Sequence, residues 1–143
     1  LSSTKTIVKN KSVVLIDDSL VRGTTCHKIV KMLYEAGAKE VHVRIACPEI
    51  KFPDFYGVDM PSKNELLANN KSNKEICDYI KAKSLRFLSL DGLYSALIAE
   101  KRNPIYPQFC DHYFTGDYPI KPHDNLKGIQ IKQLSLLSGK SSF

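Results

Sequence analysis

Long apolar runs and paired cysteines are what this sequence lacks. No window approaches the ~20 consecutive apolar residues that a helix needs to cross a bilayer, and no signal-peptide pattern opens the chain. Its four cysteines are widely spaced, and no two of them form a Cys-x-x-Cys pair. These absences argue against a membrane-spanning protein, a structural zinc site and a dithiol redox pair. We therefore expect reduced thiols and a cytoplasmic location.

A basic stripe interleaved with aromatic residues is also missing. The chain carries 21 Lys and Arg against 15 Asp and Glu, a net charge of +6. The lysines are scattered through expected helices and loops, which is typical of a solvated surface. We expect no nucleic-acid interface, although a positive field of this size would attract a polyanion.

The length and composition are those of one ordinary globular domain. The chain has 143 residues, of which 43% are hydrophobic and 25% are charged. That is enough to bury a sizeable core. The first residue is Leu1 and not Met, so we expect a fragment or a processed chain.

The most informative segment is residues 13–25. Four β-formers lead into Asp17 and Asp18, a short Ser/Gly/Thr turn follows, and a helical pattern begins near Cys26. This order predicts a strand that delivers a polar loop to the carboxyl edge of a sheet, where open α/β folds bind ligands. Backbone amides and hydroxyls at a helix N-terminus suit a phosphate, and carboxylates suit sugar hydroxyls or Mg²⁺. A phosphorylated sugar that carries a metal ion would suit both the loop and the two carboxylates.

The rest of the sequence predicts an α/β fold with a parallel sheet flanked by helices. The run in the first strand is apolar on both faces, which predicts a central strand covered by helices on both sides. Two capping boxes, at residues 62–65 and 72–75, predict helix starts. The expected strands are 12–16, 41–46 and 85–88, with a short β-like stretch at 6–8; the expected helices are 25–35, 62–69, 72–81 and 90–99; residues 101–125 are expected to be irregular.

Residues 13–25 resemble the 13-residue phosphoribosyl pyrophosphate (PRPP) motif of type I phosphoribosyltransferases. The sequence of residues 17–25, Asp-Asp-Ser-Leu-Val-Arg-Gly-Thr-Thr, is similar to this motif as it occurs in the glutamine PRPP amidotransferase (amidophosphoribosyltransferase) family. Further matches follow in order at residues 36–42, 55–59, 65–68, 85–93 and 114–119. The resemblance implies that residues 1–119 are the C-terminal portion of a phosphoribosyltransferase domain, a partial type I fold. Residues 120–143 would form an irregular C-terminal tail.

The family resemblance also implies an activity and a site. The activity is the synthesis of 5-phosphoribosylamine from PRPP and glutamine-derived ammonia, the first step of de novo purine synthesis. PRPP, purine nucleotides and further copies of the chain in a homo-oligomer are the implied partners, and Mg²⁺ is the implied cofactor. Asp17 and Asp18 would contact the ribose hydroxyls and the metal ion, and no side chain need act as a covalent nucleophile. The 5′-phosphate loop would comprise Ser19, Val21, Arg22, Gly23, Thr24 and Thr25, with Arg22 directed to solvent or a neighbouring loop.

The chain departs from the family at positions where many bacterial members bind a [4Fe–4S] cluster. Position 54 is Asp, and the later Cys-x-x-Cys pair falls on Pro107 and Cys110. One thiolate remains where three can be checked, and a cluster needs about four. We therefore expect no iron–sulfur cluster.

A second departure concerns what the matches omit. The family's N-terminal glutaminase domain and the first half of its phosphoribosyltransferase domain have no counterpart here. We therefore expect a strand edge that would otherwise pair with upstream chain. The chain would then be a fragment of a longer product, a degenerate reading frame, or a subunit completed by a second chain.

Other interpretations of the sequence stay open. The chain could be a non-catalytic remnant or a nucleotide-binding module, and residues 17–25 alone could be an acidic turn with an ordinary helix cap. A purine-salvage phosphoribosyltransferase is a third possibility, but the matches between residues 55 and 119 argue against it. His27 and His42 lack a paired base or nucleophile and are expected to be structural, whereas His112 and His123 suggest no role.

Overall fold

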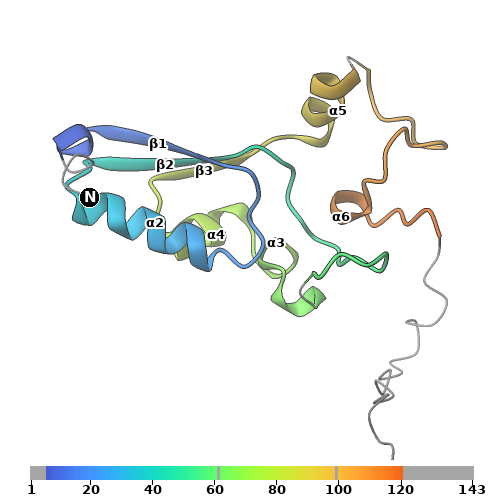
Figure 1. The fold of residues 1–143 in the computed structure, drawn as a ribbon, viewed down its shortest axis with the longest axis horizontal. Coiled ribbons are helices and arrows are strands. Elements are labelled where there is room, and N and C mark those ends of the chain that lie inside the picture. The colour runs from blue at the N-terminus through green and yellow to red at the C-terminus, as the bar shows by residue number, and fades with distance from the viewer. Residues whose placement is uncertain (1–5, 61, 99, 121–143) are drawn as a thin grey trace, which may run out of the picture.

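The computed structural model describes residues 6–60, 62–98 and 100–120. The expectation of an α/β fold with a parallel sheet is confirmed (Figure 1). Within these ranges no helix has the length and apolar character needed to cross a membrane. The elements are β1 (Ser12–Asp17), α2 (Thr24–Glu35), β2 (Glu40–Ile45), η1 (Lys63–Glu65), α3 (Leu67–Asn70), α4 (Asn73–Ile80), β3 (Ser84–Phe87), α5 (Leu90–Ile98) and α6 (His112–Thr115). The proposed tail falls, from residue 121 on, outside the described residues.

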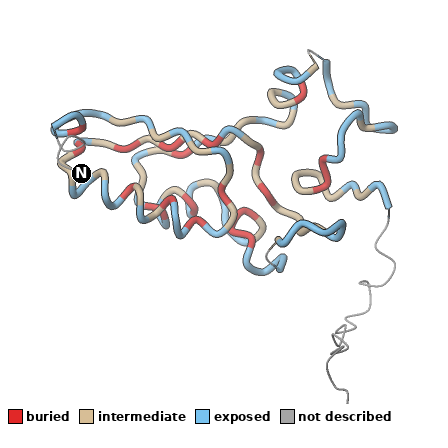
Figure 2. Tube along the Cα trace, in the orientation of Figure 1, coloured by how far each residue is buried: buried red, intermediate tan, exposed pale blue. Residues whose placement is uncertain are grey.

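The three strands pair in parallel in the order β1-β2-β3. Val13 pairs with Val41, and Val43 pairs with Leu85, so apolar residues form a row across the sheet. Helices α2, α3 and α4 lie together on one face of the sheet (Figure 1). Figure 2 shows buried positions along the strands and on α2 and α4, with others in α5 and α6. The fully buried residues of this core are Val30, Val41, Val43, Ile76 and Ile80.

The other face of the sheet is uncovered within the described residues. Val14 is 59% exposed and Ile16 is 72% exposed, whereas Val13 and Leu15 pack against the core. Alternate side chains of a strand point to opposite faces, so Val14 and Ile16 share the face away from α2 and α4. The expectation that β1 is covered on both sides is therefore wrong for this part of the chain. In the described sheet β1 is an edge strand.

Several local predictions also need correction. Residues 6–8 are helical and not β-like, and the expected helix 62–69 is split in two. Ser62 forms the predicted capping box with Glu65, but Leu66 is extended, so the turn ends and α3 begins separately. The short helix α6 lies in a stretch that the sequence predicts as irregular.

Helix α2 confirms the helix expected at residues 25–35. Cys26 and Val30 are buried, whereas Met32 is exposed. Residues four apart share a helix face, and residues two apart lie on nearly opposite faces. Because Val30 faces the core, Met32, two residues later, faces solvent. The helix ends at Glu35, and Gly37, two residues later, has a left-handed φ of 96°.

A buried carboxylate holds the segment that contains α5 and α6. Asp111 accepts hydrogen bonds from Arg102 Nε at 2.6 Å and from the Tyr94 hydroxyl at 2.7 Å. Arg102 also contacts Asp117 at 2.7 Å. Burial opposes ionisation of Asp111, but the bonds from Arg102, Tyr94 and Thr115 outweigh it, and they hold its pKa below the usual range. This network fastens the loop before α6 to α5.

Acid should loosen this segment. A carboxyl whose folded pKa is depressed stabilises the fold above its unfolded pKa of about 3.9, and that stability is lost as the pH falls through the folded value. Asp111 is such a group. The chain contains no Trp, so near-ultraviolet circular dichroism of its tyrosines reports on this region. We expect the tyrosine signal to be steady from pH 7 to about pH 5 and to decline below about pH 4. A signal unchanged down to pH 2 would contradict this role of Asp111.

Candidate functional site

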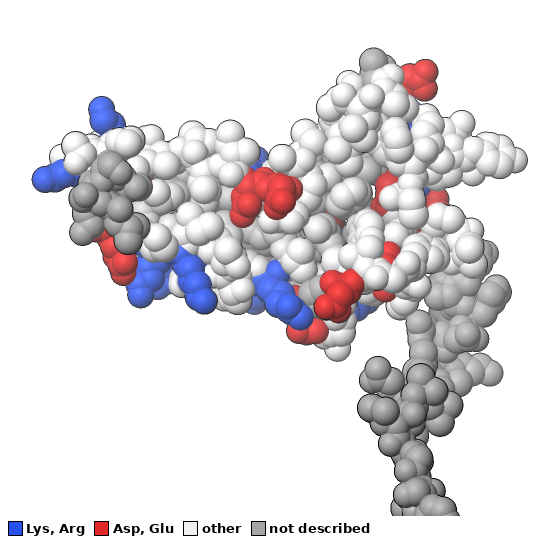
Figure 3. All heavy atoms as spheres, viewed as in Figure 1, with Lys and Arg blue, Asp and Glu red and all other residues white. Residues whose placement is uncertain are grey.

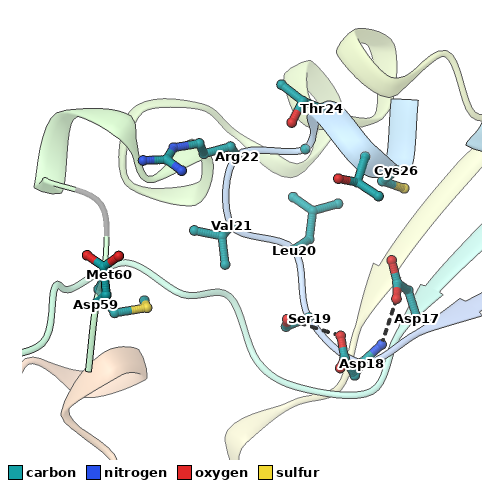
Figure 4. A pocket seen from close by; sticks show the side chains of 12 residues that line it. Asp17, Asp18, Ser19, Leu20, Val21, Arg22, Thr24, Cys26, Asp59 and Met60 are labelled. Carbon is teal, nitrogen blue, oxygen red and sulfur yellow. Dashed lines mark hydrogen bonds between the residues drawn. The ribbon is translucent and has the colours of Figure 1, made fainter. Parts of the chain in front are cut away.

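A pocket of about 440 Å³ opens at the carboxyl end of β1 (Figure 4). All eight residues that the sequence predicts for ribose and phosphate binding line it, together with Leu20 and Cys26. Asp59 and Met60, which follow β2, complete the wall opposite the loop. Reasoning from the residues does not find these two, although Asp59 closes one of the segments that match the family. The structure thus brings carboxylates and phosphate-type loop to one cavity.

The two carboxylates keep oxygen atoms free for a ligand. Asp17 Oδ1 accepts a hydrogen bond from the Asp18 amide at 3.1 Å, and Asp18 Oδ1 accepts one from the Ser19 hydroxyl at 3.1 Å. In the described part of the chain neither carboxylate has a salt bridge to a Lys or Arg side chain. Figure 3 shows acidic atoms over the end of β1, in a hollow of the surface. Two adjacent carboxylates without a protein cation suit hydroxyl donors or a metal ion.

The loop after the carboxylates is fixed to the core at several points. Leu20 is 2% exposed and belongs to the hydrophobic core. The carbonyl of Val21 accepts a hydrogen bond from the Leu67 amide at 2.9 Å, which ties the loop to α3. Gly23 is buried at the turn into α2 with φ 72°. The loop therefore has a defined shape before any ligand binds.

The N-terminus of α2 opens into this pocket without a side-chain cap. Gly23 precedes the helix, no side chain of the described residues accepts from its first amides, and its first turn holds no acidic residue. The Thr24 and Thr25 side chains, both exposed, add hydroxyl donors beside these amides. Unpaired amides and the positive end of the helix dipole attract an anion. The chemistry of this corner matches a phosphate group.

Arg22 is directed away from the phosphate corner. Its Nη2 lies 3.0 Å from Glu65 Oε1, and both side chains are about half exposed. Hydrogen bonds from Ser62 and then from Arg22 lower the pKa of Glu65, so the partner stays ionised at neutral pH. The expected orientation towards a neighbouring loop is what the structure shows. Arg22 holds the loop to η1 and leaves the phosphate corner to backbone amides.

The thiols near the site are poor nucleophiles. Burial, and then the negative charge of Asp17, raises the pKa of Cys26 to about 11. Burial and the charge of Asp18 also raise the pKa of Cys47. Both sulfurs are therefore protonated at neutral pH. Neither of these two cysteines is therefore suited to act as a covalent nucleophile.

The residues present fit Mg²⁺ bound together with a phosphorylated ligand. Among the described residues no group of three His, Cys, Asp or Glu side chains is arranged to hold a metal ion. Mg²⁺ usually keeps several waters and binds through one or two carboxylates plus substrate phosphates. Asp17 and Asp18 supply that number of carboxylates. A complete protein cage is not required.

Gly23 should not tolerate a larger residue. A Cβ at this position would lie 2.7 Å from Leu67 Cδ2 and 3.2 Å from Tyr79 Cε1, and φ is left-handed. Strain and overpacking together should lower the free energy of unfolding of G23A by roughly 2 to 4 kcal/mol. Urea denaturation followed by far-ultraviolet circular dichroism measures this. Gly57→Ala is a matched control, because Gly57 also has positive φ but has nothing within 4 Å of its Cβ position. Equal losses in the two variants would show that crowding at Gly23 contributes nothing.

The positions of the family's cluster cysteines carry different chemistry here. Asp54 and Cys110 both contact the ring of His112, through opposite nitrogens. Pro107 has no thiol. Asp54 and Cys110 therefore lie on opposite sides of the His112 ring and do not converge on one metal ion. The absence of an iron–sulfur cluster stays a prediction, and His112, for which the sequence suggests no role, is the centre of a hydrogen-bond network.

The fold and the site together define part of a type I phosphoribosyltransferase. Its first described strand delivers paired carboxylates and a phosphate-type loop to the N-terminus of the next helix. No family model matches the chain. Known proteins do. An amidophosphoribosyltransferase of Rhizobium etli is 53% identical over 138 residues, which cover 96% of this chain and 28% of that protein.

Further relatives agree. An amidophosphoribosyltransferase of Staphylococcus aureus strain N315 is 51% identical over 124 residues, which are 87% of this chain and 25% of that protein. The glutamine PRPP amidotransferase of B. subtilis, solved in complex with ADP and GMP, has a TM-score of 0.76 at 43% identity. The match covers 85% of this chain and 26% of that structure. The chain is homologous to amidophosphoribosyltransferases, and it spans about a quarter of their length.

Proposed function

We propose that this chain supplies the ribose-5-phosphate-binding part of a PRPP site. The enzyme would make 5-phosphoribosylamine from PRPP and glutamine-derived ammonia, the first step of de novo purine synthesis. The observation that carries the proposal is the gathering of Asp17, Asp18 and the loop to Thr25 around one pocket. The homologous amidophosphoribosyltransferases support the same reaction.

The loop holds the 5′-phosphate end of the substrate. The uncapped amides at the start of α2 donate to phosphate oxygens, and the hydroxyls of Ser19, Thr24 and Thr25 can add donors. Because Gly23 has no side chain, the backbone can approach the phosphate closely. These contacts fix the position of the ribose relative to the end of β1.

The carboxylates orient the sugar ring. Asp17 and Asp18 accept hydrogen bonds from the 2′- and 3′-hydroxyls, through oxygens that the protein leaves free. Ammonia then displaces pyrophosphate at C1 with inversion, through a transition state of oxocarbenium character. Negative charge close to the ring stabilises positive charge that develops on it. Binding at both ends of the ribose holds C1 in line for attack.

Asp17 and Asp18 are also the residues that would hold Mg²⁺, which when bound neutralises charge on the departing pyrophosphate. No step requires a nucleophilic side chain, in agreement with the raised pKa of Cys26. Groups that contact the pyrophosphate and deliver ammonia would come from the parts of an amidophosphoribosyltransferase that this chain does not match. We further propose a cytoplasmic homo-oligomer, with purine nucleotides bound through their 5′-phosphates.

Calorimetry with PRPP, ribose 5-phosphate and GMP, each with and without Mg²⁺, tests the binding function. PRPP binding that Mg²⁺ strengthens is the expected result. Release of pyrophosphate from PRPP with ammonium ions, which makes glutamine unnecessary, tests the reaction. Nucleotide binding without Mg²⁺-dependent PRPP binding would favour the nucleotide-binding module, and no binding of any phosphorylated ribose would refute the proposal.

A further inference from the structure

A thiol, an imidazole and a carboxylate lie in series beside α6, outside the phosphate pocket. Cys110 Sγ is 3.2 Å from His112 Nδ1, and His112 Nε2 is 2.9 Å from Asp54 Oδ1. The side chains of His112 and Asp54 are each 1% exposed, whereas Cys110 is exposed. A buried base thus touches a thiol that solutes can reach. Nothing in the proposed PRPP reaction uses these three residues.

Asp54 is the fixed end of this series. Its Oδ2 accepts hydrogen bonds from the amides of Tyr56 and Val58, both at 2.8 Å, and its Oδ1 accepts one from the Tyr113 hydroxyl at 3.0 Å. Burial opposes ionisation, but these bonds and the one to His112 outweigh it and lower the pKa of Asp54. The group is therefore a carboxylate at neutral pH.

The carboxylate determines where the proton of His112 lies. An ionised carboxylate only accepts hydrogen bonds, so the ring nitrogen that faces Asp54, Nε2, carries a hydrogen. In the neutral ring Nδ1 then has a free lone pair, and it points at the Cys110 sulfur. This nitrogen can take the thiol proton, and the imidazolium that forms is stabilised by Asp54.

Aromatic rings enclose His112 and keep it in place. Ring centroids of Tyr113, Tyr118 and Tyr56 lie 4.0, 4.9 and 5.2 Å from that of His112. Burial, and then Asp54, raises the pKa of Tyr113 to about 12, so this neighbour is uncharged. Burial raises the pKa of Tyr118 as well. Asp54 is the charged group that contacts the ring.

The nearby Asp111 carboxylate is engaged elsewhere. It binds Arg102 and the Tyr94 hydroxyl. Among the described residues no Lys or Arg side chain forms an ion pair with Asp54. Among the described residues, Asp54 is therefore the carboxylate that can stabilise His112 when its Nδ1 accepts the Cys110 proton.

Among the residues that the structure describes, no histidine or carboxylate forms a hydrogen bond with the thiols of the other three cysteines. The Cys47 thiol donates to the Pro48 carbonyl and the Cys77 thiol donates to the Ala82 carbonyl, each at 3.2 Å. A carbonyl can hold a thiol proton but cannot remove it. Burial raises the pKa of both thiols, and that of the buried Cys26.

We propose that Cys110 is a nucleophilic thiol that exchanges with low-molecular-weight disulfides, with His112 as its base and Asp54 as a positioning residue. The proton of Sγ passes to His112 Nδ1, and Sγ attacks one sulfur of the disulfide. A new S–S bond to Cys110 forms, and the S–S bond of the reagent breaks. The leaving thiolate takes the proton from the imidazolium or from water, so the products are a mixed disulfide on Cys110 and one free thiol.

The test uses the full chain and glutathione disulfide at pH 7, with peptide mapping by mass spectrometry. We expect Cys110 to form the mixed disulfide at least about 10-fold faster than Cys77, the internal control, because His112 Nδ1 lies 3.2 Å from the Cys110 sulfur and can accept its proton, whereas Cys77 contacts a carbonyl. The same ratio should shrink to near one in urea, where the network is lost. Equal rates for the two cysteines in the folded chain would overturn the proposal.

A pH profile and variants separate a base from a merely structural histidine. In the unaltered chain, alkylation of Cys110 by iodoacetamide should begin to rise at a lower pH than alkylation of Cys77, and a common profile would refute the assignment. His112→Gln should bring the Cys110 rate to that of an ordinary exposed thiol. His27→Gln is the matched control, since His27 Nδ1 contacts the Tyr79 carbonyl and no thiol, and it should leave the Cys110 rate unchanged.

Discussion

Replacing Asp17 and Asp18 together by Asn is expected to weaken Mg²⁺-dependent PRPP binding by about 100-fold or more. Each carboxylate offers a charged acceptor to a ribose hydroxyl or the metal ion, and such hydrogen bonds contribute roughly 1.5 to 3 kcal/mol each. Asn keeps the size of the side chain but removes the charge. Two such losses correspond to two or more powers of ten in the dissociation constant. Titration calorimetry with and without Mg²⁺ measures the effect.

Asp78→Asn is the matched control for this experiment. Asp78 is exposed on α4 and does not line the pocket, so its variant should bind PRPP like the unaltered chain. Ribose 5-phosphate should lose affinity in the double variant by a smaller factor, because it carries no pyrophosphate to share a metal ion. Wild-type affinity in the double variant would reject Asp17 and Asp18 as ligand residues.

Replacing Arg102 by Met is expected to lower the free energy of unfolding more than the other single substitutions proposed for this chain. The variant leaves the Asp111 carboxylate, 4% exposed, without its cation. Breaking a buried ion pair on one side costs about 3 to 5 kcal/mol, because the remaining charge is buried and uncompensated. The neutral hydroxyls of Tyr94 and Thr115 would remain as donors to that carboxylate. Urea unfolding followed by tyrosine circular dichroism should show the lower midpoint.

Arg86→Met serves as the control, since Arg86 is exposed on β3 and has no ion pair among the described residues. It should change the free energy of unfolding by less than about 0.5 kcal/mol. Adding Asp111→Asn to Arg102→Met removes the orphaned charge and should restore part of the loss. If Arg102→Met and Arg86→Met unfold at the same urea concentration, the Arg102–Asp111 pair does not stabilise the fold.

Local patterns were sufficient to predict the sheet and the pocket loop. Four β-formers before two acids define β1, and the Ser/Glu spacing at residues 72–75 marks the start of α4. Both signals are local, since they depend on strand propensity and on a side chain that caps its own helix. The loop between β1 and α2 follows from the same stretch of sequence, which explains why its residues line one cavity.

Long-range contacts explain most of what the sequence did not predict. Whether Ile16 is buried depends on what covers its face of the sheet, and a strand pattern alone carries no such information. Asp59 joins the pocket wall through the path of the loop after β2. Asp54 and His112 are 58 residues apart in sequence, and no spacing rule connects them. Their pairing becomes visible only in three dimensions.

The parallel pairing of the three strands has a consequence for how the chain reaches its fold. Ser12 meets Glu40 across 28 residues, and His42 meets Ser84 across 42, because each parallel neighbour requires a crossover. Closing such loops costs entropy before the strand contacts offset that cost. We therefore expect this topology to fold more slowly than a helical bundle of equal length. During synthesis β1 emerges from the ribosome before β2, its partner in the described sheet, and chaperone binding to its apolar run would protect it in that interval.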